Sequence, residues 1–385
     1  MTQFKKMWGL LSSLVFITQL SFGQYYQPQS RVWALGNKKG LDFSTNPPTI
    51  INTGLSSANE GSATVSNQLG QLQFCTNGTN VWNAEGNMMP NGNNINGSGL
   101  NTASTTQAAV IVPVPNDDDR YIVFSLTPVL NCRLYANIVD MRLNDGLGDV
   151  DTNFVFRKVM LRNSLTEKMT AAPGCNNDVW LLVHSNVTPS FYAYHITENG
   201  LDTNVVVSHV GNLAPASYNQ GVMKVSPDGR KIMTNTFAAA GGTIGTEIYD
   251  FDPATGIVSN AQLIDVINGY GGTFSPKGTK LYIQEITVPG SIYQFDLDAD
   301  DITSTKTLVG RSGQYCDMKI APDEKIYVAS NINSMGFNSY RYFARINAPD
   351  VAGSGCMFQD TVSSLPFPAA TGNNGILTQG LQNDV

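Results

Sequence analysis

Six polar residues recur at matching places in a repeated sequence pattern. Each precedes an apolar segment that runs into a turn containing Pro or Asn. Carboxylate, amide and phenol groups that converge on one small opening can hydrogen-bond a sugar or a peptide end, or hold a cation. The alternative is that they satisfy backbone groups and hold water, as buried polar groups generally do. The six residues are Glu60, Gln107, Glu167, Gln220, Tyr270 and Tyr315.

A second group of polar residues follows the second strand of each unit, in loops that we expect at the same opening. These are Asn77, His184, Asn235, Glu285 and Asn331. Our predicted binding set adds His184 and Asn235 to the first six. As a base, His184 needs a carboxylate within hydrogen-bond reach, and Glu167 is the best candidate. The alternative is a structural histidine, hydrogen-bonded at the end of a strand.

The sequence holds none of the common catalytic motifs. It has no G-x-S-x-G, no H-E-x-x-H, no phosphate-binding glycine loop and no Cys beside a plausible base. We therefore predict no catalytic residues and a non-catalytic module that binds a glycan or a protein. The alternative is a lactonase-like or glycan-cleaving hydrolase that uses Glu60, Glu167 and His184 with a divalent cation.

The segment FDLDADD places Asp296, Asp298 and Asp300 at alternate positions, as at the start of a calcium loop. The remaining positions do not fit the twelve-residue calcium loop, because the sixth position is Asp301 instead of Gly and the twelfth is Thr307 instead of Glu. A solvated turn is the better interpretation of this segment. The acidic run 117–119 is also interpreted as a solvated turn. We predict no metal site and no cofactor, with calcium as the alternative.

These side chains must be positioned by a repeated element. The stretches GVMKVSPDGRKIMTNTF, GGTFSPKGTKLYIQEI and CDMKIAPDEKIYVAS each predict a strand, a tight turn and a second strand. A second pair of strands is predicted after such hairpins, as at 246–266 and 291–310. A period near 50 residues with four strands per unit is typical of a β-propeller blade. The hairpin turns are anchored at Asn67, Pro115, Pro173, Pro227, Pro276 and Pro322.

We therefore predict an all-β fold, a β-propeller of seven four-stranded blades that forms a single domain over residues 24–385. Residues 31–54 resemble the outer pair of strands of a blade that lacks its inner hairpin. The tail 374–385 can supply an innermost strand, so both ends of the chain would share the closing blade. Closure of this kind removes free sheet edges.

The N-terminus has the order of a secretory signal peptide over residues 1–23: Lys5 and Lys6, the apolar run 7–17, then small residues. No later stretch approaches the length of a membrane span. We expect a secreted or outer-surface monomer. The net charge of −7 argues against a nucleic-acid partner. The five cysteines are odd in number and contain no C-x-x-C pair, and their pairing stays open.

Several stretches resemble one family closely. They include WALGNKKGLDF, NEGSATVSNQLGQLQFCTNGTNVWNAEGNMMPNG, STTQAAVIVPVPNDDDRYIVFSL, YANIVDMRLNDGLGDV, EKMTAAPGCNNDVWLLVHSN and FYAYHITENGL. They are similar to the propeller region of large surface proteins of gliding bacteria, which are exported by the type IX secretion route. The resemblance implies a propeller at the cell exterior, often as the leading part of an adhesin-like chain, and it implies no catalytic residues.

Members of that family usually continue past the segment that matches GLQNDV. They add another strand, further repeat domains and a C-terminal sorting module, whereas this chain ends at Val385. We expect either a truncated chain, whose closing blade is one strand short, or a different arrangement for export.

Overall fold

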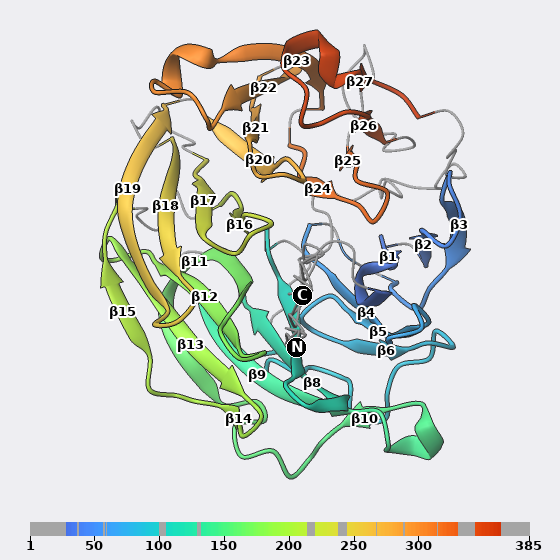
Figure 1. The fold of residues 1–385 in the computed structure, drawn as a ribbon. Helices are drawn as coiled ribbons and strands as arrows, with labels where there is room; N and C mark the ends of the chain where they lie inside the picture. Colours follow the sequence, from blue (N-terminus) through green and yellow to red (C-terminus); the bar gives the residue numbers. More distant parts are fainter. Residues whose placement is uncertain are drawn as a thin grey trace, which may run out of the picture.

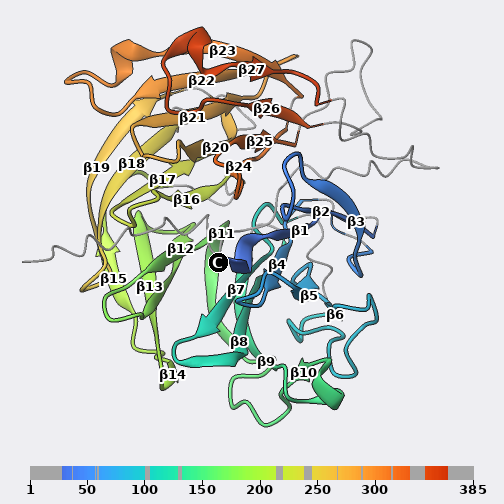
Figure 2. The same cartoon turned by 45° about the vertical axis from the view of Figure 1, so that its right-hand side comes forward.

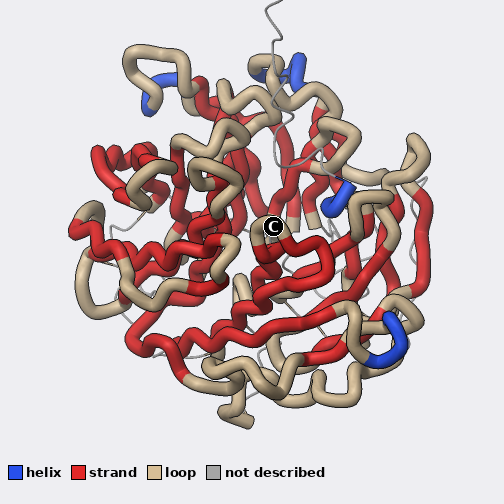
Figure 3. Tube along the Cα trace, turned by 60° about the horizontal axis from the view of Figure 1, so that its bottom comes forward, coloured by secondary structure: helices blue, strands red, loops and turns tan. Residues whose placement is uncertain are grey.

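Antiparallel strand pairing accounts for nearly all of the regular structure (Figure 3). The computed structural model describes residues 28–36, 38–56, 58, 60–99, 105–128, 132–213, 220–237, 245–266, 268–287, 289–313, 315–329 and 343–362. The helices described are single 3-10 turns: η2 (Pro28–Ser30), η4 (Asn144–Gly146), η6 (Thr303–Thr305) and η7 (Gly353–Cys356). None of these has the length or the apolar character to cross a membrane.

The strands form consecutive antiparallel sheets along the chain. The first two hold β1 (Val32–Ala34), β2 (Lys39–Asp42) and β3 (Thr49–Asn52), then β4 (Ala63–Ser66), β5 (Leu72–Thr76) and β6 (Val81–Asn83). The third holds β7 (Ala109–Val114), β8 (Asp117–Leu126), β9 (Cys132–Asp140), β10 (Asp149–Val150), β11 (Met160–Pro173), β12 (Val179–Ser185), β13 (Ser190–Thr197), β14 (Gly200–Leu201) and β15 (Val206–His209).

Three four-stranded sheets follow. They hold β16 (Met223–Val225), β17 (Lys231–Asn235), β18 (Thr246–Asp252) and β19 (Ile257–Asp265); β20 (Gly269–Phe274), β21 (Lys280–Glu285), β22 (Gly290–Asp296) and β23 (Thr307–Ser312); and β24 (Met318–Ile320), β25 (Ile326–Val328), β26 (Ala344–Ile346) and β27 (Phe358–Gln359).

All six predicted hairpin turns are confirmed. Asn67, Pro115, Pro173, Pro227, Pro276 and Pro322 each lie at or beside the junction of two paired strands. The predicted outer pairs at 246–266 and 291–310 are β18–β19 and β22–β23. Proline presets the first corner of such a turn, and the apolar alternation on either side buries both faces of the sheet.

Strand β11 departs from the prediction of separate four-stranded units. Its first half pairs with β9, with Leu165 opposite Cys132, and its second half pairs with β12, with Met169 opposite Val183. No Pro or Gly interrupts residues 160–172, so the backbone continues from one unit into the next. The register shifts between Leu165 and Met169, and the result is one nine-stranded sheet where we expected two blades.

The first sheet also differs from its prediction. Residues 31–54 form three strands, β1 to β3, where we expected a pair. The additional strand arises because Leu35 and Lys39 close a turn that folds residues 32–34 onto 40–42. The predicted signal peptide (1–23) and the closing segment (374–385) lie outside the described residues.

The innermost strands contact one another in chain order around a centre (Figure 1). β4 contacts β7, β7 contacts β11, and the series continues through β16 and β20 to β24. Both ribbon views place β1–β3 between the β24–β27 and β4–β6 sheets (Figure 1, Figure 2). The fold therefore brings the first and the last described sheets together.

Buried hydrophobic clusters lie between neighbouring sheets. Trp33 of β1 packs against Tyr327 of β25, with ring centroids 5.9 Å apart. Similar clusters join β4–β6 to β7–β9 through Phe74 and Tyr121, and β12–β13 to the next sheet through Phe191 and Tyr249. Because each sheet buries its faces against the next, the interfaces between sheets form the core.

Candidate functional site

Two hydrogen-bonded pairs join the inner strands, one between distant sheets and one between the segment before β7 and the neighbouring strand β11. The Tyr270 hydroxyl of β20 donates to Glu60 Oε2 at 3.0 Å, and Glu60 precedes β4. Glu167 Oε2 of β11 accepts from both the backbone N and Oγ1 of Thr106, each at 2.8 Å. Burial, reinforced by the nearby Glu60 carboxylate, holds the Tyr270 pKa well above its usual value, so its hydroxyl keeps its proton.

Gln107 ties three inner strands together. Its Oε1 accepts from the backbone N of Met223 at 2.8 Å and of Met169 at 3.1 Å, while its Nε2 donates to the Met223 carbonyl at 3.0 Å. These partners belong to β16 and β11, and Gln107 itself precedes β7. With an exposure of 1%, the side chain satisfies backbone groups that would otherwise be buried without partners.

His184 and Lys168 form a separate buried pair of groups beside this network. His184 Nδ1 is buried without a hydrogen-bond partner among the described residues, so this nitrogen makes no bond to Glu167, the candidate partner named from the sequence. Burial and the adjacent Lys168 lower the His184 pKa to about 3. Burial also lowers the Lys168 pKa to about 7, against the opposing effect of Glu167. The Lys168 amine donates to the Gln220 carbonyl at 2.9 Å.

Asn235 lies in β17 and is fully buried. Its Nδ2 donates to the Gly271 carbonyl at 2.6 Å, and its Oδ1 accepts from the Thr246 hydroxyl at 2.6 Å. Asn77 is also buried, and its Oδ1 accepts from the backbone N of Thr79 and Asn80. Both amides hold loops in shape through these hydrogen bonds. Asn331 lies outside the described residues.

Three half-buried residues at the predicted opening carry one amide and two aromatic rings. Gln220, Phe237 and Tyr315 are half-buried, whereas Glu60, Gln107 and Glu167 are buried. Tyr315 makes edge contacts with Phe237 and Tyr270, with centroids 5.8 and 5.6 Å apart. We call these three residues, Gln220, Phe237 and Tyr315, the rim of the channel mouth.

Buried lysines are the group that the sequence interpretation missed. Lys224 Nζ of β16 lies 3.2 Å from Asp317 Oδ2, and both side chains are 2% exposed. Lys319 of β24 is also 2% exposed, and its amine lies 5.7 Å above the Trp33 ring. The available signal was a lysine inside an apolar strand in VMKVSP and DMKIAP, since lysine is almost never fully buried unless it is paired.

The acidic turn at Asp296 behaves as a capped turn. Asp296 Oδ1 accepts from Lys280 Nζ at 2.9 Å and from the Asp298 backbone N, and these bonds lower its pKa. In the described part of the chain, no three His, Cys, Asp or Glu side chains are grouped so as to hold a metal ion. Four cysteines are buried and Cys175 is exposed.

Comparison with solved structures supports the fold. The chain is similar to a "putative 6-phosphogluconolactonase" from Bacteroides uniformis, with a TM-score of 0.50 and 11% identity over 86% of this chain and 94% of that one. A protein of the same description from Bacteroides fragilis gives a TM-score of 0.47 and 12% identity over 83% and 92%. No family model and no curated protein matches. The fold is all-β and propeller-like.

Proposed function

We propose that this chain is a seven-bladed β-propeller that binds a glycan or a partner protein outside the cell, without catalysis. The observation that carries the proposal is the channel mouth. Its carboxylates are already engaged, Glu60 with Tyr270 and Glu167 with Thr106, while the rim offers an amide and two aromatic rings. Such a surface suits recognition, since aromatic faces and amides contact sugars and peptides without a reactive group.

Hydrophobic packing supports the count of seven blades. The two halves of the nine-stranded sheet pack against each other through one cluster, which includes Val112 and Tyr194. Treated as two blades, they bring the total to seven, and each neighbouring pair shares a cluster. The three strands β1–β3 would then be the outer part of a blade.

Export rests on the N-terminal sequence, and N-terminal sequencing of the protein recovered outside the cells tests it. We expect the first residue to be Gln24. Recovery of the protein inside the cells with residues 1–23 intact would contradict export.

Ligand binding is tested at the rim, where substitutions disturb folding least. A glycan array probed with the protein should give hits that the double variant Gln220→Ala/Tyr315→Ala loses. The matched control, Gln262→Ala/Tyr293→Ala, removes the same groups from β19 and β22, away from the inner strands, and should keep every hit. Equal binding by both variants, each with wild-type circular dichroism, would reject the rim as the site.

A hydrolase is the second candidate. The observation that favours it is Lys168, whose buried amine has a pKa of about 7 and could exchange protons near neutral pH. The solved structures of similar fold suggest 6-phosphogluconolactone as the substrate to try. We expect no acceleration over spontaneous hydrolysis. Acceleration that Lys168→Met and Glu167→Gln abolish would replace the binding proposal.

A further inference from the structure

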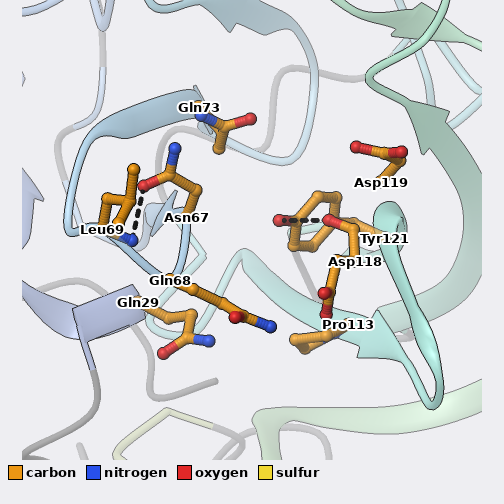
Figure 4. A pocket seen from close by; sticks show the side chains of 9 residues that line it. All are labelled: Gln29, Asn67, Gln68, Leu69, Gln73, Pro113, Asp118, Asp119 and Tyr121. Atoms are coloured by element: carbon orange, nitrogen blue, oxygen red, sulfur yellow. Dashed lines mark hydrogen bonds between the residues drawn. The ribbon is translucent and has the colours of Figure 1, made fainter.

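A polar cavity is lined by residues in and beside the β4–β5 and β7–β8 turns (Figure 4). The mouth residues Glu60 and Gln107 precede β4 and β7, whereas the cavity is lined by the turns that follow these strands. Its volume is about 250 Å³, which is room for roughly eight water molecules at about 30 Å³ each. That space suits a single ring-sized ligand rather than an extended chain.

One wall presents side-chain amides from the β4–β5 turn and the segment before β1. Asn67 fixes the turn, because its Oδ1 accepts from the backbone N of Leu69 at 2.9 Å and of Gln71 at 3.0 Å. Gln68 in this turn and Gln73 of β5 both line the cavity. Gln29 adds a third amide to the lining of the cavity.

The opposite wall presents carboxylates and a phenol from β8. Asp118 and Asp119 are exposed, and neither forms an ion pair within the described residues. The neighbouring Asp117 does, with Arg142 Nη2 at 3.6 Å. The Tyr121 hydroxyl donates to the Asp118 carbonyl at 3.1 Å, which holds the wall in place. Burial and the three aspartates raise the Tyr121 pKa to about 12, which agrees with a negative potential at this wall.

We propose that this cavity binds an amino-sugar unit of a glycan. Amides that face carboxylates across a ring-sized space match a ligand that has hydroxyl groups on one side and an ammonium group on the other. Glutamine side chains can both donate to and accept from hydroxyls, while ionised aspartates accept from an ammonium. The net charge of −7 also attracts a cationic glycan and repels sulfated or uronic sugars.

The proposal is tested by isothermal titration of the full chain at pH 5.5. The probes are β-1,4-linked glucosamine, N-acetylglucosamine and glucose oligomers of equal length, which differ only at the amine position. We expect the glucosamine oligomer to bind at least tenfold more tightly than the other two. Equal affinity for all three, or no binding of the glucosamine oligomer at millimolar concentration, would overturn the proposal.

Two variants locate the binding. Asp118→Asn/Asp119→Asn should lower the affinity for the glucosamine oligomer at least tenfold. This variant should then no longer prefer the glucosamine oligomer to the other two oligomers. Asp298→Asn/Asp300→Asn removes two charges from another exposed turn and should leave the affinity unchanged. If both variants weaken binding equally, the attraction comes from overall charge and the cavity proposal fails.

Discussion

The Tyr270 hydroxyl donates a hydrogen bond of 3.0 Å to Glu60 Oε2, although the two residues are 210 positions apart in the sequence. Tyr270 belongs to β20 and Glu60 precedes β4, so the bond joins sheets that lie on different sides of the centre (Figure 1). Both side chains are buried. This bond therefore links distant units of the chain directly, in addition to the packing between neighbouring sheets.

Tyr270→Phe tests the strength of this link. The substitution keeps the ring and removes the donor, which leaves a buried carboxylate oxygen without that hydrogen bond. We expect a loss of about 1 to 3 kcal/mol in the free energy of unfolding, measured by urea denaturation. Tyr293→Phe is the control, because Tyr293 is half-buried and its ring faces the Lys306 amine; its effect should stay within about 0.5 kcal/mol. Equal losses in the free energy of unfolding for the two variants would show that the Tyr270–Glu60 hydrogen bond does not stabilise the fold.

Removal of one partner of the Lys224–Asp317 ion pair should be more costly. Both side chains are 2% exposed, so Asp317→Asn leaves the Lys224 charge buried without that carboxylate. Loss of one partner from such a pair costs about 3 to 5 kcal/mol. Replacement of both residues, as Lys224→Met/Asp317→Leu, removes the uncompensated charge and should cost less than the single change. A double variant less stable than Asp317→Asn would contradict this account.

The exposed Lys231–Asp250 pair provides the matched control for the buried one. Its atoms lie 3.0 Å apart, but its side chains are 44% and 46% exposed. Water and salt weaken such pairs, so Asp250→Asn should cost no more than about 1 kcal/mol. Both variants are compared in the same denaturant series, with and without added salt, and only the exposed pair should respond to salt.

His184 should make the protein less stable in acid. Its pKa falls from an ordinary value near 6.5 to about 3 in the folded chain. Between these values the unfolded chain binds a proton that the folded chain does not, so stability is complete above pH 6.5 and falls as the pH drops towards 3. In His184→Gln, urea denaturation at several pH values should show that the free energy of unfolding falls less steeply over this window. His209→Gln, which leaves His184 in place, should show the same pH dependence as the wild type. If the wild type and both variants show the same pH dependence, His184 does not cause the loss of stability.

The hairpins could be predicted from sequence because their signals are local. Pro227 and Pro276 each follow an apolar strand and preset the first corner of a turn, and both turns are found where expected. The continuity of β11 through residues 160–173 was missed, since the apparent period of the repeat suggested a break between units. A bulged strand shared by two units has no Gly or Pro that would mark a boundary between the units in the sequence.

The contacts of the candidate site could be predicted only in part. Placement of Glu60 and Tyr270 at the starts of inner strands followed from the repeat, and the two are indeed in contact. The partner of Glu167 proved to be Thr106 instead of His184, because the choice depends on which way two adjacent side chains face at a register shift. The cavity beside Asp118 depends on two turns that meet only in the folded chain.

Gln107→Ala should loosen three inner strands at once. In the native chain Oε1 of Gln107 accepts from the backbone N of Met169 and Met223, and both amides are buried away from solvent. Without that oxygen, local opening costs less, so their hydrogen exchange should accelerate at least tenfold while amides of β25, such as Tyr327, keep their rates. Gln107→Glu retains an acceptor but loses the donor to the Met223 carbonyl at 3.0 Å; it should protect Met169 better than the alanine variant does. Mass spectrometry of exchanged peptides checks both variants. Unchanged hydrogen-exchange rates at residues 169 and 223 in Gln107→Ala would show that the Gln107 side chain does not hold these strands together.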